Sequence, residues 1–115
     1  MLDVKVDRSE SASLHEQVSA SIRRALADGE AAPGERLPPA KDLARVLDVN
    51  SNTVLRALRI LRDEGLVEFR RGRGVTVTAT PEKSAIVSRS LEFLEFARSQ
   101  GLGRDEVIQL IRTLP

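Results

Sequence analysis

The polar side chains with the clearest chemical potential lie at residues 50–73. Asn52, Thr53 and Arg56 share one segment at helical spacing. An asparagine amide can form two hydrogen bonds with adenine, and a guanidinium can do the same with guanine. Each such pair is worth about 1–3 kcal/mol of base discrimination. These residue types favour reading of DNA bases. The alternatives are that Asn52 and Thr53 only cap a helix or bind phosphate, and that Arg56 is simply solvated.

A second cationic group follows at Arg71 and Arg73, which flank Gly72. The runs on either side, 66–70 and 75–78, alternate apolar and polar residues, so the three residues form the turn of a predicted β-hairpin. Glycine lets the backbone approach a neighbouring molecule closely. The alternative is a hairpin tip whose charges only favour solubility.

Positive charge is concentrated around these two groups. Residues 36–73 carry nine Lys or Arg against five Asp or Glu, although the whole chain has a net charge of only +1. A polyanion-binding surface requires such an asymmetry. A solvated charged face explains the same counts equally well, so the counts alone do not decide.

Two short apolar stripes must position these side chains, and they meet at residues 50–53. The stripes are Leu43, Ala44 and Leu47, then Val54, Ala57, Leu58 and Leu61. Asn50 or Ser51 can cap the second helix, so the pattern predicts a helix-turn-helix with a recognition helix at about 51–64. At 100° per residue, Asn52, Arg56 and Arg59 lie opposite the core face. Leu55 lies at the border, where it could meet a thymine methyl.

The preceding segments predict a strand, a helix and a loop. Residues 2–6 alternate with period 2, and Ser13 with Glu16 has capping-box spacing at the head of a helix that continues to about Ala27. Two proline-containing pairs mark residues 30–39 as a connecting loop. We expect Pro39 at the first position of the next helix, where its missing N–H costs nothing.

The last region has a different character, because it predicts two helices, 81–99 and 104–114, that are apolar on more than one face. Such a pair cannot bury itself against one small winged helix, and C2 pairing with a second copy is the economical solution. The expected dimerisation residues are Ile86, Leu91, Phe93, Leu94, Phe96, Val107, Ile108 and Ile111.

These segments together predict a mainly α fold with a small β-hairpin. Residues 1–80 form a winged helix-turn-helix DNA-binding domain, with a wing at about 70–75. Residues 81–115 form a two-helix dimerisation segment. The function this favours is a sequence-specific transcriptional regulator that binds double-stranded DNA as a homodimer. The alternative is a winged-helix module that binds proteins without binding specific DNA.

Composition excludes several other classes. The chain has 115 residues, no cysteine and one histidine, and no set of residues suits nucleophilic catalysis or metal binding. We therefore expect no enzymatic activity and no cofactor. The amino-terminal residues do not read as a signal peptide, and no apolar run approaches 18 residues, so we expect a cytoplasmic protein without membrane contact. The sequence does not decide whether the protein binds a small-molecule effector.

Five motifs, in order and with the expected gaps over about 14–77, resemble the amino-terminal domain of GntR-family bacterial transcription regulators. They are Pro33-Gly34-x-x-Leu37-Pro38, Lys41-x-Leu43-Ala44, Asn50-x-Asn52-Thr53-Val54-x-Arg56-Ala57, Glu64-Gly65-Leu66-Val67 and Arg71-Gly72-Arg73-Gly74. The short two-helix tail and the leading strand look like the YtrA subfamily, whose members are small dimeric repressors.

The resemblance implies roles for individual residues. Lys41 stands where relatives have an arginine that contacts DNA, and as an ammonium it acts mostly as a point charge on phosphate. Arg71, Gly72 and Arg73 match the minor-groove probe of the family, which reads groove width more than sequence. Ser51 stands at a position often held by arginine or proline, so it bears on base preference. Weaker phosphate-contact candidates are Arg45, Arg59 and Arg70.

Overall fold

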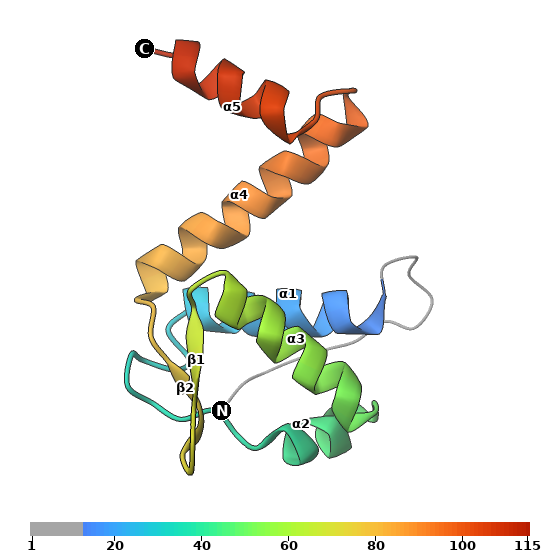
Figure 1. Ribbon diagram of the computed structural model, residues 1–115, viewed down its shortest axis with the longest axis vertical. Coiled ribbons are helices and arrows are strands. Elements are labelled where there is room, and N and C mark those ends of the chain that lie inside the picture. The colour runs from blue at the N-terminus through green and yellow to red at the C-terminus, as the bar shows by residue number, and fades with distance from the viewer. Residues whose placement is uncertain (1–12) are drawn as a thin grey trace.

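The computed structural model describes residues 13–115, so the strand predicted at residues 2–6 lies outside the described residues. Figure 1 shows three helices and a hairpin packed together, with two further helices rising from them. The elements are α1 (Leu14–Ala27), α2 (Ala40–Leu47), α3 (Ser51–Asp63), β1 (Val67–Arg70), β2 (Gly74–Val77), α4 (Pro81–Ser99) and α5 (Arg104–Thr113). The predicted winged helix-turn-helix and two-helix tail are confirmed.

The core lies between α1, α2, α3 and the base of the hairpin. The stripe predicted on α3 is confirmed, since Val54, Ala57, Leu58 and Leu61 have no exposed surface. From α1, Val18, Ile22 and Leu26 pack into the same cluster. Burial of each large aliphatic side chain stabilises the fold by about 1.5–3 kcal/mol. This core holds α2, α3 and the base of the hairpin in a fixed arrangement.

Helix ends follow the sequence closely, with one correction, at Pro39. The Asn50 side chain accepts a hydrogen bond from the Asn52 backbone N–H at 2.7 Å, so Asn50 alone is the N-cap of α3, and Ser51 is its first helical residue. Pro39 is the N-cap of α2 and not its first helical residue. Its ψ of 148° is extended, and its carbonyl accepts the first bonds of the helix, from the N–H groups of Asp42 and Leu43.

Residues 34–37, which the sequence predicted as part of a loop, pair with the wing in the manner of a third strand. β1 and β2 pair antiparallel, with Val67 opposite Val77 and Arg70 opposite Gly74. Along the other edge of β2, the Leu37 N–H donates to the Val75 carbonyl at 2.8 Å. Gly34 and Glu35 exchange similar bonds with Val77. Residues 34–37 therefore form the outer edge of the wing.

A buried ion pair joins α1 to the end of α3. The Arg23 guanidinium donates two hydrogen bonds to the Glu64 carboxylate, at 2.8 and 2.7 Å. Only 8% of the Arg23 side chain and 19% of the Glu64 side chain are exposed. The planar fork matches both carboxylate oxygens, so the pair fixes the orientation of α3 relative to α1.

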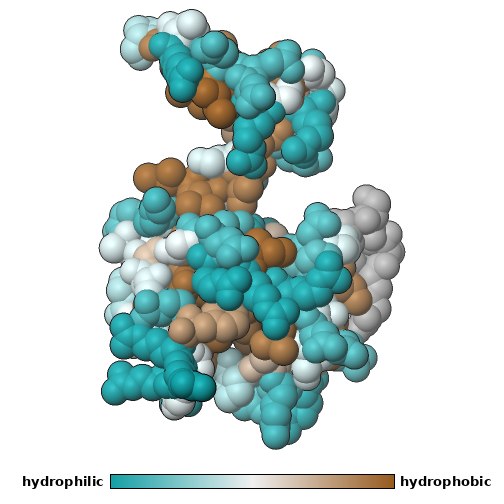
Figure 2. Space-filling view, in the orientation of Figure 1, coloured by the Kyte–Doolittle hydropathy of each residue, from teal (hydrophilic) through white to brown (hydrophobic). Residues whose placement is uncertain are grey.

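The first part of α4 packs against α1, whereas its second part projects away and carries α5 (Figure 1). Ser84 is fully buried, and Val87 packs against the core. Ala97 and Val107 are buried near the α4–α5 junction. Most of the remaining apolar surface of α4 and α5 is open, and Figure 2 shows hydrophobic colour there. No helix among residues 13–115 is long and apolar enough to cross a membrane.

Candidate nucleic-acid interface

The amino-terminal end of α3 presents the polar residues predicted to read bases. Asn52, Arg56 and Arg59 are exposed, while Thr53 and Leu55 are half-buried at the border of the core face. Within the described residues, the side chains of Arg56 and Arg59 have no ion-pair partner. Each guanidinium therefore keeps its donors available to an incoming acceptor, as recognition of a base edge or phosphate requires.

The hairpin tip lies at the same end of the molecule as α2 and the start of α3, as the lower part of Figure 1 shows. Arg71, Gly72 and Arg73 are all exposed. The Arg73 N–H donates to the Arg70 carbonyl at 2.9 Å and closes the turn. Gly72 and Gly74 have φ values of 76° and 74°, a region that strongly favours glycine. Glycine at these positions makes the sharp tip possible.

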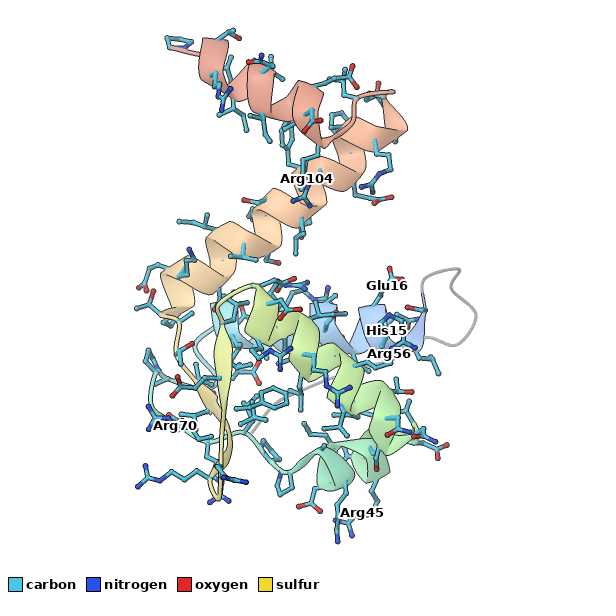
Figure 3. All side chains as sticks on the ribbon, in the orientation of Figure 1. His15, Glu16, Arg45, Arg56, Arg70 and Arg104 are labelled. Carbon is cyan, nitrogen blue, oxygen red and sulfur yellow. The ribbon has the colours of Figure 1, made fainter. Side chains whose placement is uncertain are left out.

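Helix α2 contributes two further cations. Lys41, in its first turn, is exposed, and Arg45 points away from the body at the lower end of Figure 3. Arg45 donates to Asp42 at 2.8 Å, but its side chain stays 77% exposed. A surface pair of this kind is worth less than about 1 kcal/mol, so it leaves Arg45 free to turn to another anion.

Sequence reasoning missed one cation at this end, Arg36. Its backbone pairs with Thr76 across the outer edge of the wing. A Cβ atom on Gly74 would lie 3.6 Å from Arg36 Nε, so the guanidinium lies over the strand near the tip. Arg36 lies here because residues 34–37 pair with β2, and no local sequence pattern predicts that pairing.

The residues predicted for dimerisation lie far from this end, on α4 and α5. Ile86, Phe93, Phe96, Ile108 and Ile111 are exposed, and Leu91 and Leu94 are half-buried. Val107 differs, because it is only 2% exposed and packs inside its own chain. Leu110 and Leu114 are exposed beside them and were not among the predicted residues.

The described residues hold no group of three or more His, Cys, Asp or Glu that could bind a metal ion. The single histidine, His15, lies 3.4 Å from the Ser13 hydroxyl at the start of α1 and is half-buried. Its surroundings are those of a helix cap. The arrangement at the other end, with exposed donors on one helix and cations on a wing, suits binding to a polyanion.

Comparison with known proteins supports the same class of function. Residues 14–77 match the family described as bacterial regulatory proteins, gntR family. The chain is 30% identical over 113 residues to the HTH-type transcriptional regulator Rv1152 of Mycobacterium tuberculosis, covering 97% of this chain and 93% of that protein. It is 44% identical over 63 residues to the Uxu operon transcriptional regulator of Escherichia coli, covering 55% of this chain and 24% of that regulator.

Among solved structures, YtrA from Sulfolobus acidocaldarius, a GntR-family transcription factor, is 30% identical, with a TM-score of 0.63. The similarity covers 77% of this chain and 97% of that one. The resemblance to the YtrA subfamily, drawn from the short two-helix tail and the leading strand, is therefore confirmed. The chain spans about a quarter of the Uxu operon regulator and nearly all of Rv1152. The family match includes α1, the helix-turn-helix and the wing, so this chain belongs to the GntR family of bacterial regulatory proteins.

Proposed function

We propose that this chain is a dimeric, sequence-specific DNA-binding transcriptional repressor that acts in the cytoplasm and has no enzymatic activity. One observation supports the proposal above all. Asn52 and Arg56 are exposed in the first half of α3, and the start of that helix lies at the same end of the molecule as α2 and the hairpin tip (Figure 1). Membership of a family of transcription regulators points the same way.

In this proposal α3 enters the major groove with its amino-terminal end toward the bases. Asn52 and Arg56 read base edges, and Thr53 and Ser51 contact bases or phosphate nearby. Half-buried Leu55 has its exposed part available for a thymine methyl. Lys41, Arg45 and Arg59 neutralise phosphates on either side, which positions the helix without adding sequence information.

The wing enters the adjacent minor groove. Arg71 and Arg73 are long enough to reach into the groove, and Gly72 lets the backbone lie close to the sugars. A narrow minor groove has an enhanced negative potential that attracts such arginines, so the wing reads groove width in preference to a full base code.

Residues 81–115 hold two such reading heads together. The exposed apolar surface of α4 and α5 includes Phe93 and Phe96, whose burial in a partner removes a large area from water. A C2 pair presents two recognition helices related by a two-fold axis. Its operator is then a pseudo-palindrome with half-sites about one helical turn, or a multiple of one, apart.

A gel-shift experiment tests the DNA-binding part. The probe is a duplex enriched by the full-length protein from a random-sequence library, compared with random duplex at 50 and 200 mM salt. We expect preference for the enriched duplex and a steep loss of affinity with salt. Arg56→Ala removes about 1–3 kcal/mol of discrimination, confined to the base pair it reads. Arg104→Ala on α5 (Figure 3) is the matched control and leaves binding unchanged.

The same experiment separates the alternative, a protein-interaction module. If the protein prefers no duplex and binds with little salt dependence, specific DNA binding is wrong. If Arg56→Ala binds the enriched duplex as the wild type does, the assignment of α3 as the reading helix is wrong.

A further inference from the structure

The outer face of the wing carries a cationic pocket, and one of its arginines, Arg36, has no role in the binding proposed above. The pocket has a volume of about 580 Å³. The walls come from the segment before α2 and from both wing strands, with Pro33, Gly34, Arg36, Glu68, Arg70 and Arg73 among the lining residues. Three arginines against one carboxylate give the walls a net charge of +2.

Strand geometry explains why these side chains share one face. Leu37 is buried toward the helices, so alternation along the edge segment directs its neighbour Arg36 to the outer face. Arg36 pairs with Thr76, which in turn pairs with Glu68 in β1. Two residues further along β1, Arg70 lies on the same face, beside the loop that leads to α2 (Figure 3).

The carboxylate in the pocket serves only one of the three arginines. The Arg70 guanidinium donates to Glu68. Within residues 13–115, the side chains of Arg36 and Arg73 have no hydrogen-bonded or ion-paired acceptor. Two guanidinium groups that share a pocket repel each other, so an anion placed between them gains from both. Phosphate oxygens suit the planar guanidinium fork.

We propose that Arg36 and Arg70, next to Arg73 at the tip, bind the phosphodiester backbone of the DNA strand that borders the groove entered by the wing. The pocket continues directly into the hairpin tip, because Arg73 belongs to both. A strand of DNA that follows the tip therefore passes this face. The contact is to phosphate alone, so it adds affinity for every sequence equally. The inference depends on the proposed DNA binding and extends it to a surface outside the helix-turn-helix.

The Glu68 carboxylate competes with an incoming phosphate for the Arg70 guanidinium. In the free protein Glu68 occupies Arg70. Removing the negative charge with Glu68→Gln also raises the net positive potential of the pocket. We therefore expect Glu68→Gln to bind DNA more tightly than the wild type, by about the same factor at any sequence.

The test uses full-length protein and the enriched and random duplexes, with dissociation constants measured across a salt series. Arg36→Ala is expected to reduce the magnitude of the salt slope by about 1. Affinity falls by about eightfold at 0.1 M salt for both duplexes, which is the loss of one phosphate contact. Arg36→Lys keeps the charge and is expected to retain most of the slope. Arg98→Ala, an exposed arginine paired with Glu95 on α4, is the matched control.

Two results would overturn the inference while leaving the proposed function standing. The first is an unchanged affinity and slope for Arg36→Ala when Arg56→Ala loses base discrimination. The second is binding of inorganic phosphate to DNA-free protein that Arg36→Ala abolishes without any change in DNA affinity, which would assign the pocket to a small free anion. If the wild-type protein binds no duplex, both the inference and the proposed function are wrong.

Discussion

The winged helix and the projecting part of the α4–α5 tail differ in how far their apolar side chains are buried. In the winged helix, Val54, Leu58 and Leu61 are fully buried in one core. In the tail, Phe96, Ile111 and Leu114 remain more than half exposed. A single chain thus contains one region that completes its own core and another that does not. The first region therefore positions its side chains by its own packing, whereas the second leaves apolar side chains uncovered within the chain.

The charged side chains also differ between the two regions. Arg23 and Glu64 fix α1 against α3 inside the winged helix. Exposed cations are carried by α2, at Lys41 and Arg45, and by the hairpin tip, at Arg71 and Arg73. On the projecting helices, Arg98 simply pairs with Glu95 one turn away on the surface. The first region therefore presents cations on a well-packed core, whereas the second combines surface charges with exposed apolar side chains.

The largest expected effect is on the core of the winged helix. Leu58→Ala leaves a cavity among fully buried neighbours and should lower the free energy of unfolding by about 2–5 kcal/mol. Ile111→Ala on α5, which is 55% exposed, is the matched control. It should change the unfolding free energy of the monomer by less than about 0.5 kcal/mol. Urea denaturation at low protein concentration measures both, and equal effects would remove the contrast between the two regions.

A somewhat smaller loss is expected for Arg23→Ala. The substitution leaves the Glu64 carboxylate largely buried without its cation, so the free energy of unfolding should fall by about 3 kcal/mol. Arg24→Ala, one residue along and exposed, is the control and should cost much less. If the two variants have the same denaturation midpoint, the ion pair does not orient α3.

The tail should respond through association and not through folding. Phe96→Ala is expected to weaken the proposed dimer by about 2 kcal/mol, or roughly 30-fold in dissociation constant. Glu92→Ala, an exposed residue on the same helix, is the control. Sedimentation over a concentration series measures the change. A wild-type protein that stays monomeric at micromolar concentration would contradict the dimer.

The smallest effect concerns the cap of the recognition helix. Asn50→Ala removes the side-chain acceptor for the Asn52 N–H and should cost about 1 kcal/mol of stability. Asn50→Asp retains an acceptor and should cost less. Thermal denaturation compares the two, and a more stable alanine variant would show that Asn50 does not cap α3.

Local sequence patterns predicted most of the winged helix, because each of its elements has a pattern that can be recognised within one short segment. The period of the apolar residues on α3 identifies one face of a helix, and the spacing from Ser13 to Glu16 identifies a helix cap. The one corrected cap position, Pro39, differs from the prediction by a single residue. Helix ends depend on the φ and ψ angles of one residue, which composition does not determine.

Long-range pairing could not be predicted in the same way. Arg23 and Glu64 are 41 residues apart, and either alone looks like a surface charge. The prolines around Arg36 indicate a loop, and only hydrogen bonds from β2 make an edge strand of residues 34–37. Which tail residues remain exposed also depends on packing, since Val107 has the same apolar character as Ile108 but is buried.

The most direct test of the central claim is selection of duplexes from a random-sequence library by the full-length protein. A self-contained reading head joined to a tail that pairs with a second copy predicts enriched sequences with two inverted half-sites. Their centres should lie about 10 base pairs, or a multiple of that, apart. No enrichment over random DNA, or a single site without an inverted copy, would contradict the claim.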